Sequence, residues 1–281
     1  MMLAGLCAVA VFAATRRAAD DGPVLAASIG EARSASLTVD IAPAAPDKVY
    51  GAPQATGRPI VVIDAGHGGR DPGATSVSGE VTERDLTLAL ARDLRDALVE
   101  RGRVRVAMTR EGDEYLTLEQ RASVAPRLGA SLFLSLHMDS APNPLARGAT
   151  VYSLSDVASD AEAERFARSE NTSFAGSGET QGSVEAMLAG LATRSQMNSS
   201  AELASRLVRK AAGRVDLRPE PHRFAAFHVL RSVETPAVLF EAGYLSNADD
   251  EILLRSPEHR AAIVLALAQA VEADIAARNR R

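Results

Sequence analysis

Short apolar runs alternate with amphipathic segments along most of this chain, from residue 60 to residue 277. Residues 60–63 read Ile-Val-Val-Ile, a run of β-branched side chains that is typical of a buried parallel strand. Leucines then recur every fourth residue from Leu86 to Leu98, which predicts a helix over residues 82–101. This alternation predicts an α/β fold with a mostly parallel central sheet flanked by helices.

The remaining strands and helices are predicted from the same two kinds of pattern, short apolar runs and amphipathic segments. Strands are predicted at residues 104–108, 131–136, 149–152, 227–230 and 237–240. Helices are predicted at residues 118–128, 161–169, 184–194, 199–214 and 257–277. We expect all of these elements to form a single domain over residues 59–278.

Composition excludes some classes of partner. The formal net charge is −5, which does not imply a basic face, so a nucleic-acid partner is not expected. The one cysteine, Cys7, lies in an apolar stretch that is too short for a comfortable transmembrane helix. We interpret residues 1–20 as a signal peptide and residues 21–58 as a linker rich in Ala, Pro, Ser and Gly. Cys7 also admits a lipoprotein interpretation, but the bulky Leu6 before it argues against lipidation.

Four polar side chains stand where this fold would gather them. His67 follows the first strand, His137 and Glu241 end two later strands, and Glu83 lies in the first turn of a helix. Because ligands bind at the carboxyl ends of strands in an open α/β sheet, these four are expected at one edge. Two imidazoles and a carboxylate are a common catalytic zinc set, and a second carboxylate can serve as general base.

Each of these residues alone also has a plain structural explanation. A single histidine after a strand is more often structural than a ligand, and the helix dipole accounts for an acid at Glu83. Glu241 could be a strand-end charge that faces solvent. The other histidines, His222, His228 and His259, give weaker signals. The His-Glu-x-x-His and Gly-x-Ser-x-Gly motifs of other hydrolases are absent from the sequence.

Four blocks of sequence resemble the zinc-dependent N-acetylmuramoyl-L-alanine amidases of the amidase 3 type, which include the cell-separation amidases of Gram-negative bacteria. The blocks are residues 62–69 (VIDAGHGG), 83–85 (ERD), 135–139 (SLHMD) and 238–247 (VLFEAGYLSN). Each block is weak alone, but their order and spacing together make the resemblance specific. It covers the chain from residue 60 to about residue 276.

The resemblance implies that His67, Glu83 and His137 bind Zn²⁺ and that Glu241 is the catalytic carboxylate. The implied reaction is hydrolysis of the amide between N-acetylmuramic acid and L-alanine in periplasmic peptidoglycan, without a stable membrane span after export. Two alternatives stay open at this point. One is a zinc peptidase that acts on the stem peptide, and the other is a wall-binding module with an inactive site.

The resemblance also gives a meaning to the polar stretch at residues 155–195. In the Gram-negative septal enzymes an insertion here forms a helix that plugs the active site until a LytM-type activator removes it. The predicted helix 184–194 looks like such a plug, and a carboxylate on it could occupy the open zinc position. Glu185 is the first candidate and Glu179 the second, although both could equally be solvated surface acids.

Overall fold

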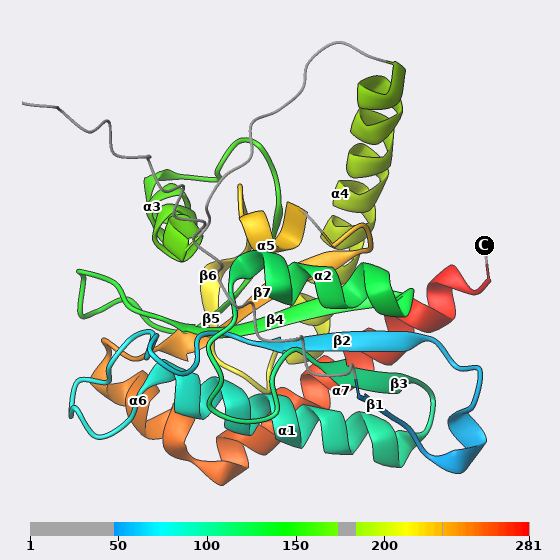
Figure 1. Cartoon of the computed structure of the whole chain (residues 1–281). Coiled ribbons are helices and arrows are strands. Elements are labelled where there is room, and N and C mark those ends of the chain that lie inside the picture. Colours follow the sequence, from blue (N-terminus) through cyan, green and yellow to red (C-terminus); the bar gives the residue numbers. More distant parts are fainter. Residues whose placement is uncertain (1–47, 174–183, 232, 281) are drawn as a thin grey trace, which may run out of the picture. The chain divides into compact units, whose positions relative to one another are not determined.

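The computed structural model describes the backbone of residues 48–173, 184–231 and 233–280 (Figure 1). It describes the side chains of these residues too, except for those within residues 173–191. Within this part of the chain, seven strands form one sheet in the order β1-β3-β2-β4-β7-β5-β6. The strands are β1 (Val49–Tyr50), β2 (Ile60–Ala65), β3 (Arg105–Met108), β4 (Leu132–Asp139), β5 (Ala149–Leu154), β6 (Leu217–Ala225) and β7 (Ala237–Tyr244). Four neighbouring pairs are parallel, while the β1–β3 and β5–β7 pairs are antiparallel. The predicted mostly parallel sheet is confirmed.

Helices cover both faces of the sheet (Figure 1). They are α1 (Glu83–Arg101), α2 (Leu118–Leu128), α3 (Ala161–Glu170), α4 (Val184–Ala211), α5 (His228–Arg231), α6 (Ala248–Arg255) and α7 (Pro257–Arg278), with short 3₁₀ turns at Pro53–Ala55 and Asn171–Ser173. One apolar core joins α1, α4, α6 and α7 to the sheet, and a second joins α2, α3 and α5 to its other face. The layered α/β architecture expected from the sequence is therefore present.

The strands that carry the site are longer than the sequence indicated. β4 continues through His137 to Asp139 and β7 through Glu241 to Tyr244, so neither residue ends its strand. Both strands lie inside the sheet and every one of their residues is buried. Because the ladder on both sides satisfies the backbone of a central strand, a polar side chain does not have to terminate it.

Three other predictions differ from the structure. Residues 227–230 were expected as a strand, but residues 228–230 belong to α5. The strand in this region is β6, which contains Pro219 and Pro221. Proline argues against a central strand, yet β6 is an edge strand, where a missing N–H is tolerated. The expected helices 184–194 and 199–214 are one helix, α4, because the residues between them include no glycine or proline. β1, inside the expected linker 21–58, pairs with β3 and so belongs to the sheet.

No helix in the described part of the chain is long and apolar enough to cross a membrane. The predicted signal peptide, residues 1–20, and most of the linker lie outside the described residues.

Candidate active site

The loop after β2 places His67 against the end of β4. His67 has φ +59°, a left-handed conformation that is uncommon outside glycine. Gly66 and Gly73 make the close packing possible, because a Cβ on Gly66 would lie 2.5 Å from the His137 ring. A Cβ on Gly73 would lie 2.5 Å from Glu83 Oε2 and 2.7 Å from the His67 ring. Gly66 and Gly73 therefore make room for the imidazoles and for Glu83.

Glu83 holds the two imidazoles together from the first turn of α1. Its Oε2 lies 3.1 Å from His67 Nε2, and its Oε1 lies 3.0 Å from His137 Nδ1. The backbone N–H groups of Ala74 and Met138 donate to the same carboxylate, at 2.9 and 3.0 Å. The structure thus brings His67, Glu83 and His137 together as the sequence predicted.

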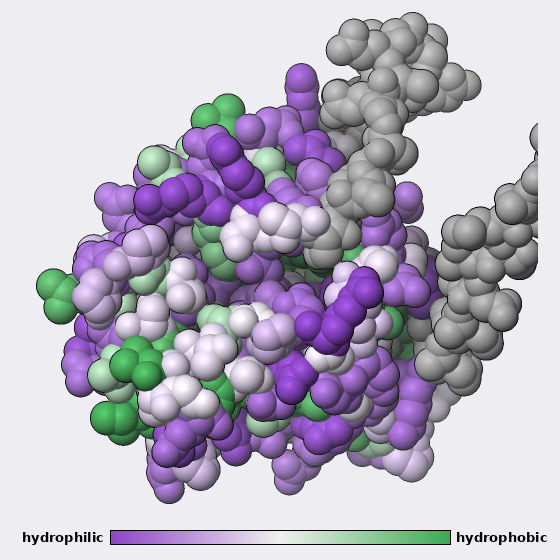
Figure 2. Space-filling view, turned by 60° about the vertical axis from the view of Figure 1, so that its left-hand side comes forward, coloured by the Kyte–Doolittle hydropathy of each residue, from purple (hydrophilic) through white to green (hydrophobic). Residues whose placement is uncertain are grey.

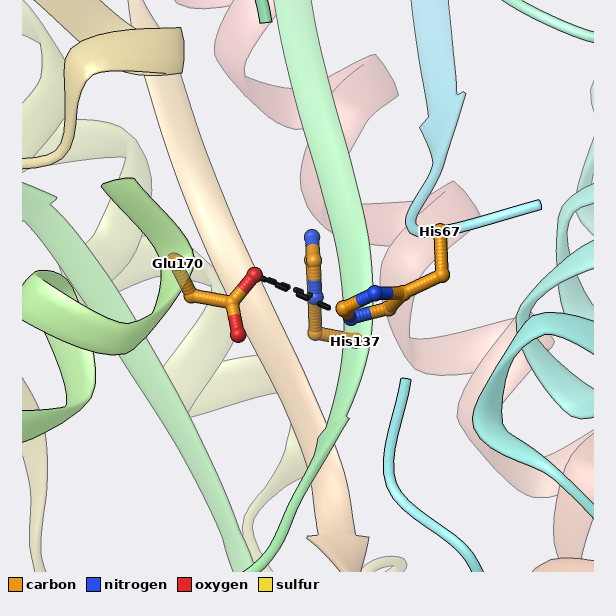
Figure 3. A group of neighbouring side chains, drawn as sticks. All are labelled: His67, His137 and Glu170. Atoms are coloured by element: carbon orange, nitrogen blue, oxygen red, sulfur yellow. Dashed lines mark ion pairs between the residues drawn. The ribbon is translucent and has the colours of Figure 1, made fainter. Parts of the chain in front are cut away.

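A fourth group, which sequence reasoning missed, comes from the last residue of α3. Glu170 Oε2 lies 3.4 Å from His137 Nδ1 and 3.7 Å from His67 Nε2 (Figure 3). One ligand atom each from His67, His137 and Glu170 lies within 4.8 Å of the other two, a spacing that one metal ion could span. Nothing in the local sequence around Glu170 distinguishes it from other helical acids. Only its place in the polar insertion pointed toward this role.

The two residues predicted to plug the site fall where the structure gives no side-chain information. Glu179 lies outside the described residues, and Glu185 is in α4 at a position whose side chain is not described. Both therefore stay predictions.

The charges in this cluster are tightly linked. Burial alone would lower the pKa of His67, but the carboxylates of Glu83 and Asp71 outweigh it and raise that pKa to about 11. Burial alone would raise the pKa of Glu83, yet the two imidazoles hold it far below its usual range. The carboxylates thus create a strong local demand for positive charge, which a proton or a metal cation can meet.

The donor set suits a zinc ion. His67 Nε2 is buried, and the groups that face it are the carboxylates of Glu83, at 3.1 Å, and Glu170, at 3.7 Å. Asp71 Oδ2 lies 3.0 Å from the other ring nitrogen, Nδ1. A carboxylate in this position commonly fixes the orientation of an imidazole whose second nitrogen binds a metal. Imidazole nitrogen and carboxylate oxygen are typical zinc ligands. The residues present therefore fit zinc, with Nε2 of His67 facing the site.

Glu241 lies on β7, directly opposite His137 on β4. Its side chain is fully buried, and neither carboxylate oxygen has a hydrogen-bond partner within the described part of the chain. Burial, followed by the nearby charges of Asp139, Glu83 and Glu170, raises the pKa of Glu241 well above its ordinary value. A raised pKa makes the carboxylate a stronger base toward a nearby water molecule.

A cavity of about 520 Å³ opens over this cluster. His67, Glu83 and His137 line one side, and Arg165, Phe166 and Glu170 of α3 line another. Glu241 is not among the lining residues. The face turned forward in Figure 2, the side on which α3 lies in Figure 1, is mainly hydrophilic.

The remaining histidines do not join the site. His222 Nε2 lies 2.9 Å from Ser153 Oγ on the neighbouring strand, and His228 begins α5. His259 lies in the first turn of α7, where its backbone N–H donates to the capping hydroxyl of Ser256.

Fold and site together define a hydrolase family. The chain belongs to the amidase 3 family, whose model, described as N-acetylmuramoyl-L-alanine amidase, matches residues 61–273. The chain is therefore an N-acetylmuramoyl-L-alanine amidase, an enzyme that hydrolyses an amide bond of peptidoglycan.

Its relatives carry the same description. The N-acetylmuramoyl-L-alanine amidase AmiA of Escherichia coli is 34% identical over 220 residues, which cover 76% of this chain and 75% of that protein. The amidase AmiC of Neisseria meningitidis serogroup B is 32% identical over 220 residues, covering 76% of this chain and 52% of that protein. Among solved structures, the catalytic domain of the amidase CwlV from Bacillus (Paenibacillus) polymyxa is similar with a TM-score of 0.56. It is 26% identical and covers 76% of this chain and 96% of that one.

Proposed function

We propose that this amidase is zinc-dependent and cuts the bond between N-acetylmuramic acid and L-alanine during wall remodelling and daughter-cell separation. The observation that carries the zinc proposal is the convergence of His67, Glu83 and His137, in which the Glu83 carboxylate lies 3.0–3.1 Å from a buried nitrogen of each imidazole. These three residues would hold the ion. When bound there, zinc would polarise the scissile carbonyl as a Lewis acid.

Glu241 would carry the proton. Its raised pKa suits a group that takes a proton from the attacking water and gives it to the departing alanine nitrogen. Its position opposite His137 keeps the carboxyl group beside the metal ligands. Because it is outside the cavity lining, it must become accessible before it can act, which requires a rearrangement near the site.

The test is digestion of purified sacculi followed by mass spectrometry of the released material. Residues 21–281 are compared with and without a chelator and beside Glu241→Ala. Chelator-sensitive release of intact stem peptides, lost in Glu241→Ala, supports the proposal. Shortened peptides would indicate a peptidase instead. Zinc binding without any hydrolysis, even in a variant with α3 released, would indicate a wall-binding module.

We further propose that the enzyme is autoinhibited, with α3 as the element that closes the site. Glu170 places a carboxylate between the two imidazoles, and α3 forms one wall of the cavity. A carboxylate there would take the coordination position that catalysis needs open. The inhibitory acid would then be Glu170, on the same insertion as the originally predicted Glu185 and Glu179.

Polar contacts fasten α3 to the edge of the sheet. Arg218 on β6 donates to both carboxylate oxygens of Glu162, at 2.6 and 3.1 Å. Arg223, five residues further along β6, donates to Asp160 at the N-terminus of α3. We call these four residues the α3 latch. All four are charged and all but the buried Arg223 are partly exposed, so a binding partner could displace these pairs with its own charges.

Aromatic and amide contacts complete the docking of α3. The Phe166 ring lies 5.3 Å from that of Tyr152 and 5.4 Å from that of Phe227, centroid to centroid. Asn171, just after α3, donates to the carbonyl of Ala226 at 2.8 Å and accepts from the backbone N–H of His228 at 2.9 Å. Release of α3 therefore requires several contacts to break together, a suitable task for an activator of the LytM type.

Glu170→Gln separates the candidates for the inhibitory acid. It should raise activator-free hydrolysis of sacculi, while Glu185→Gln and Glu179→Gln should leave it near the wild-type rate. A rise in either of the latter, with Glu170→Gln unchanged, would return the role to the α4 side of the insertion. Deletion of residues 177–194 tests that segment as a whole.

We place the enzyme in the periplasm, with residues 1–20 removed on export and residues 59–278, together with β1, as the catalytic domain. Expression of the full chain with the mass of the exported form measured would test the cleavage. An exported protein that retains its first 20 residues would contradict it.

A further inference from the structure

Two arginines lie buried behind the loop that carries His67. Arg110 follows β3 and Arg121 lies in α2, and each is only 3% exposed. Buried guanidinium groups are costly unless all their donors are used, so the oxygens that they contact show what they do.

The two side chains bond to three consecutive backbone carbonyls of that loop. Arg121 donates to the carbonyls of Ala65 and His67, both at 2.6 Å. Arg110 donates to the carbonyls of Ala65 and Gly66, at 2.9 and 3.0 Å. The last strand residue and the first two loop residues are therefore all held by guanidinium donors.

These arginines are used mainly as donors to the backbone rather than as ion pairs. Arg110 also donates to the carbonyls of Gly112 and Arg84 and to the hydroxyl of Thr87. Arg121 makes one buried ion pair, with Asp64 at 2.9 Å. Burial, and then repulsion from Arg121, lowers the pKa of Arg110. Two like charges side by side behind a cation site would weaken that site, so a compensating role is expected.

What the two arginines can offer in return is a fixed backbone conformation for His67. Its left-handed backbone is unfavourable for a non-glycine residue and persists only where surrounding contacts impose it. We propose that Arg121 and Arg110 are positioning residues that clamp the carbonyls of residues 65–67, so that the His67 ring faces Glu83. The part of this proposal that concerns zinc affinity rests on the proposed zinc site.

The variant Arg121→Lys tests the clamp because lysine keeps the charge but cannot reach two carbonyls and Asp64 with one planar fork. Arg101→Lys is the matched control. Arg101 makes a two-bond pair with the buried carboxylate of Glu272, at 2.7 Å for each bond, away from the site. Both variants replace a guanidinium that contacts a buried carboxylate, but only Arg121 also bonds to the His67 loop.

Two readouts keep the clamp and the zinc proposal apart. In the metal-free protein, peptides that cover residues 66–73 should exchange amide hydrogen faster in Arg121→Lys than in wild type or Arg101→Lys. In a competition titration with a chromophoric chelator, Arg121→Lys should bind zinc 10- to 100-fold more weakly, as expected for outer-shell changes, and Arg101→Lys within about twofold of wild type. Failure of wild type to bind zinc would overturn the zinc site but leave the exchange test of the clamp intact.

Arg110→Lys provides a second variant if Arg121→Lys does not fold. Arg110 holds the carbonyls of Ala65 and Gly66 but not that of His67, so its loss should weaken zinc binding less. Unchanged exchange over residues 66–73 in a folded variant of either arginine would overturn the proposal. Equal effects in Arg101→Lys would also overturn it, since the change would then reflect general stability.

Discussion

The α3 latch can be tested by comparing two glutamates of α3, one that belongs to the latch and one that does not. Glu162 and Glu164 both lie in the first turn of α3. The side chain of Glu162 is 27% exposed and pairs with Arg218 on β6. That of Glu164 is 61% exposed and pairs with Arg168 on its own helix. Replacement by glutamine removes the same dipole interaction at both positions. Only Glu162→Gln weakens contacts with the sheet, which are those to Arg218 and Arg223 on β6 and to Tyr244 on β7, whereas Glu164→Gln weakens a pair within α3.

The size of the effect follows from the geometry of the pair. A surface ion pair is worth up to about 1 kcal/mol, and a hydrogen bond to a charged group about 1.5–3 kcal/mol. The partly buried, two-bond contact between Glu162 and Arg218 falls between these limits, at about 1.5 kcal/mol. Because about 1.4 kcal/mol is a factor of ten, Glu162→Gln should raise the undocked fraction of α3 about tenfold while that fraction is small.

The assay is dye release from labelled sacculi without activator, and hydrogen exchange over residues 161–170 is measured in parallel. Glu162→Gln should increase both about tenfold, and Glu164→Gln should change neither by more than about twofold. Equal rates for the two variants would refute the latch. Faster exchange without faster hydrolysis would show that α3 is docked by Glu162 but does not restrain the enzyme.

Three further predictions concern the site itself. Zinc at 100 times its Kd should stabilise the fold by about 2.7 kcal/mol and raise Tm by about 5–10 °C, and a chelator or His137→Ala should abolish this shift, measured by calorimetry. Gly73→Ala should lose zinc binding, since its Cβ would meet Glu83 and His67 at a φ of +65°; unchanged affinity in a titration would contradict this. Burial alone would raise the pKa of Asp64, but Arg121, Ser135 and Thr109 outweigh it and lower that pKa in the folded protein. The contribution of ionised Asp64 to the free energy of unfolding is therefore complete above the pKa of the unfolded chain, and it is lost as pH falls below about 4. In urea unfolding, the stability gap between wild type and Asp64→Asn should narrow from pH 6 to pH 3, and a constant gap would disprove the assignment.

The sequence by itself determined the class of fold and the centre of the site. β-branched runs and four-residue leucine spacing are local patterns, and they respond to whether a segment is buried on one face or two. The first strand and the helix after it were therefore predicted well. His67, Glu83 and His137 could be grouped because parallel strands place their carboxyl ends at one edge.

Only the tertiary structure decided which groups complete and restrain that centre. Glu170 reaches the imidazoles because α3 is docked by Arg218, some 50 residues away in sequence, on a strand whose prolines concealed it. Arg110 and Arg121 bond to backbone carbonyls, which leave no trace in the identity of the residues that they hold. Contacts of this kind depend on where whole elements pack, and no local periodicity encodes that choice.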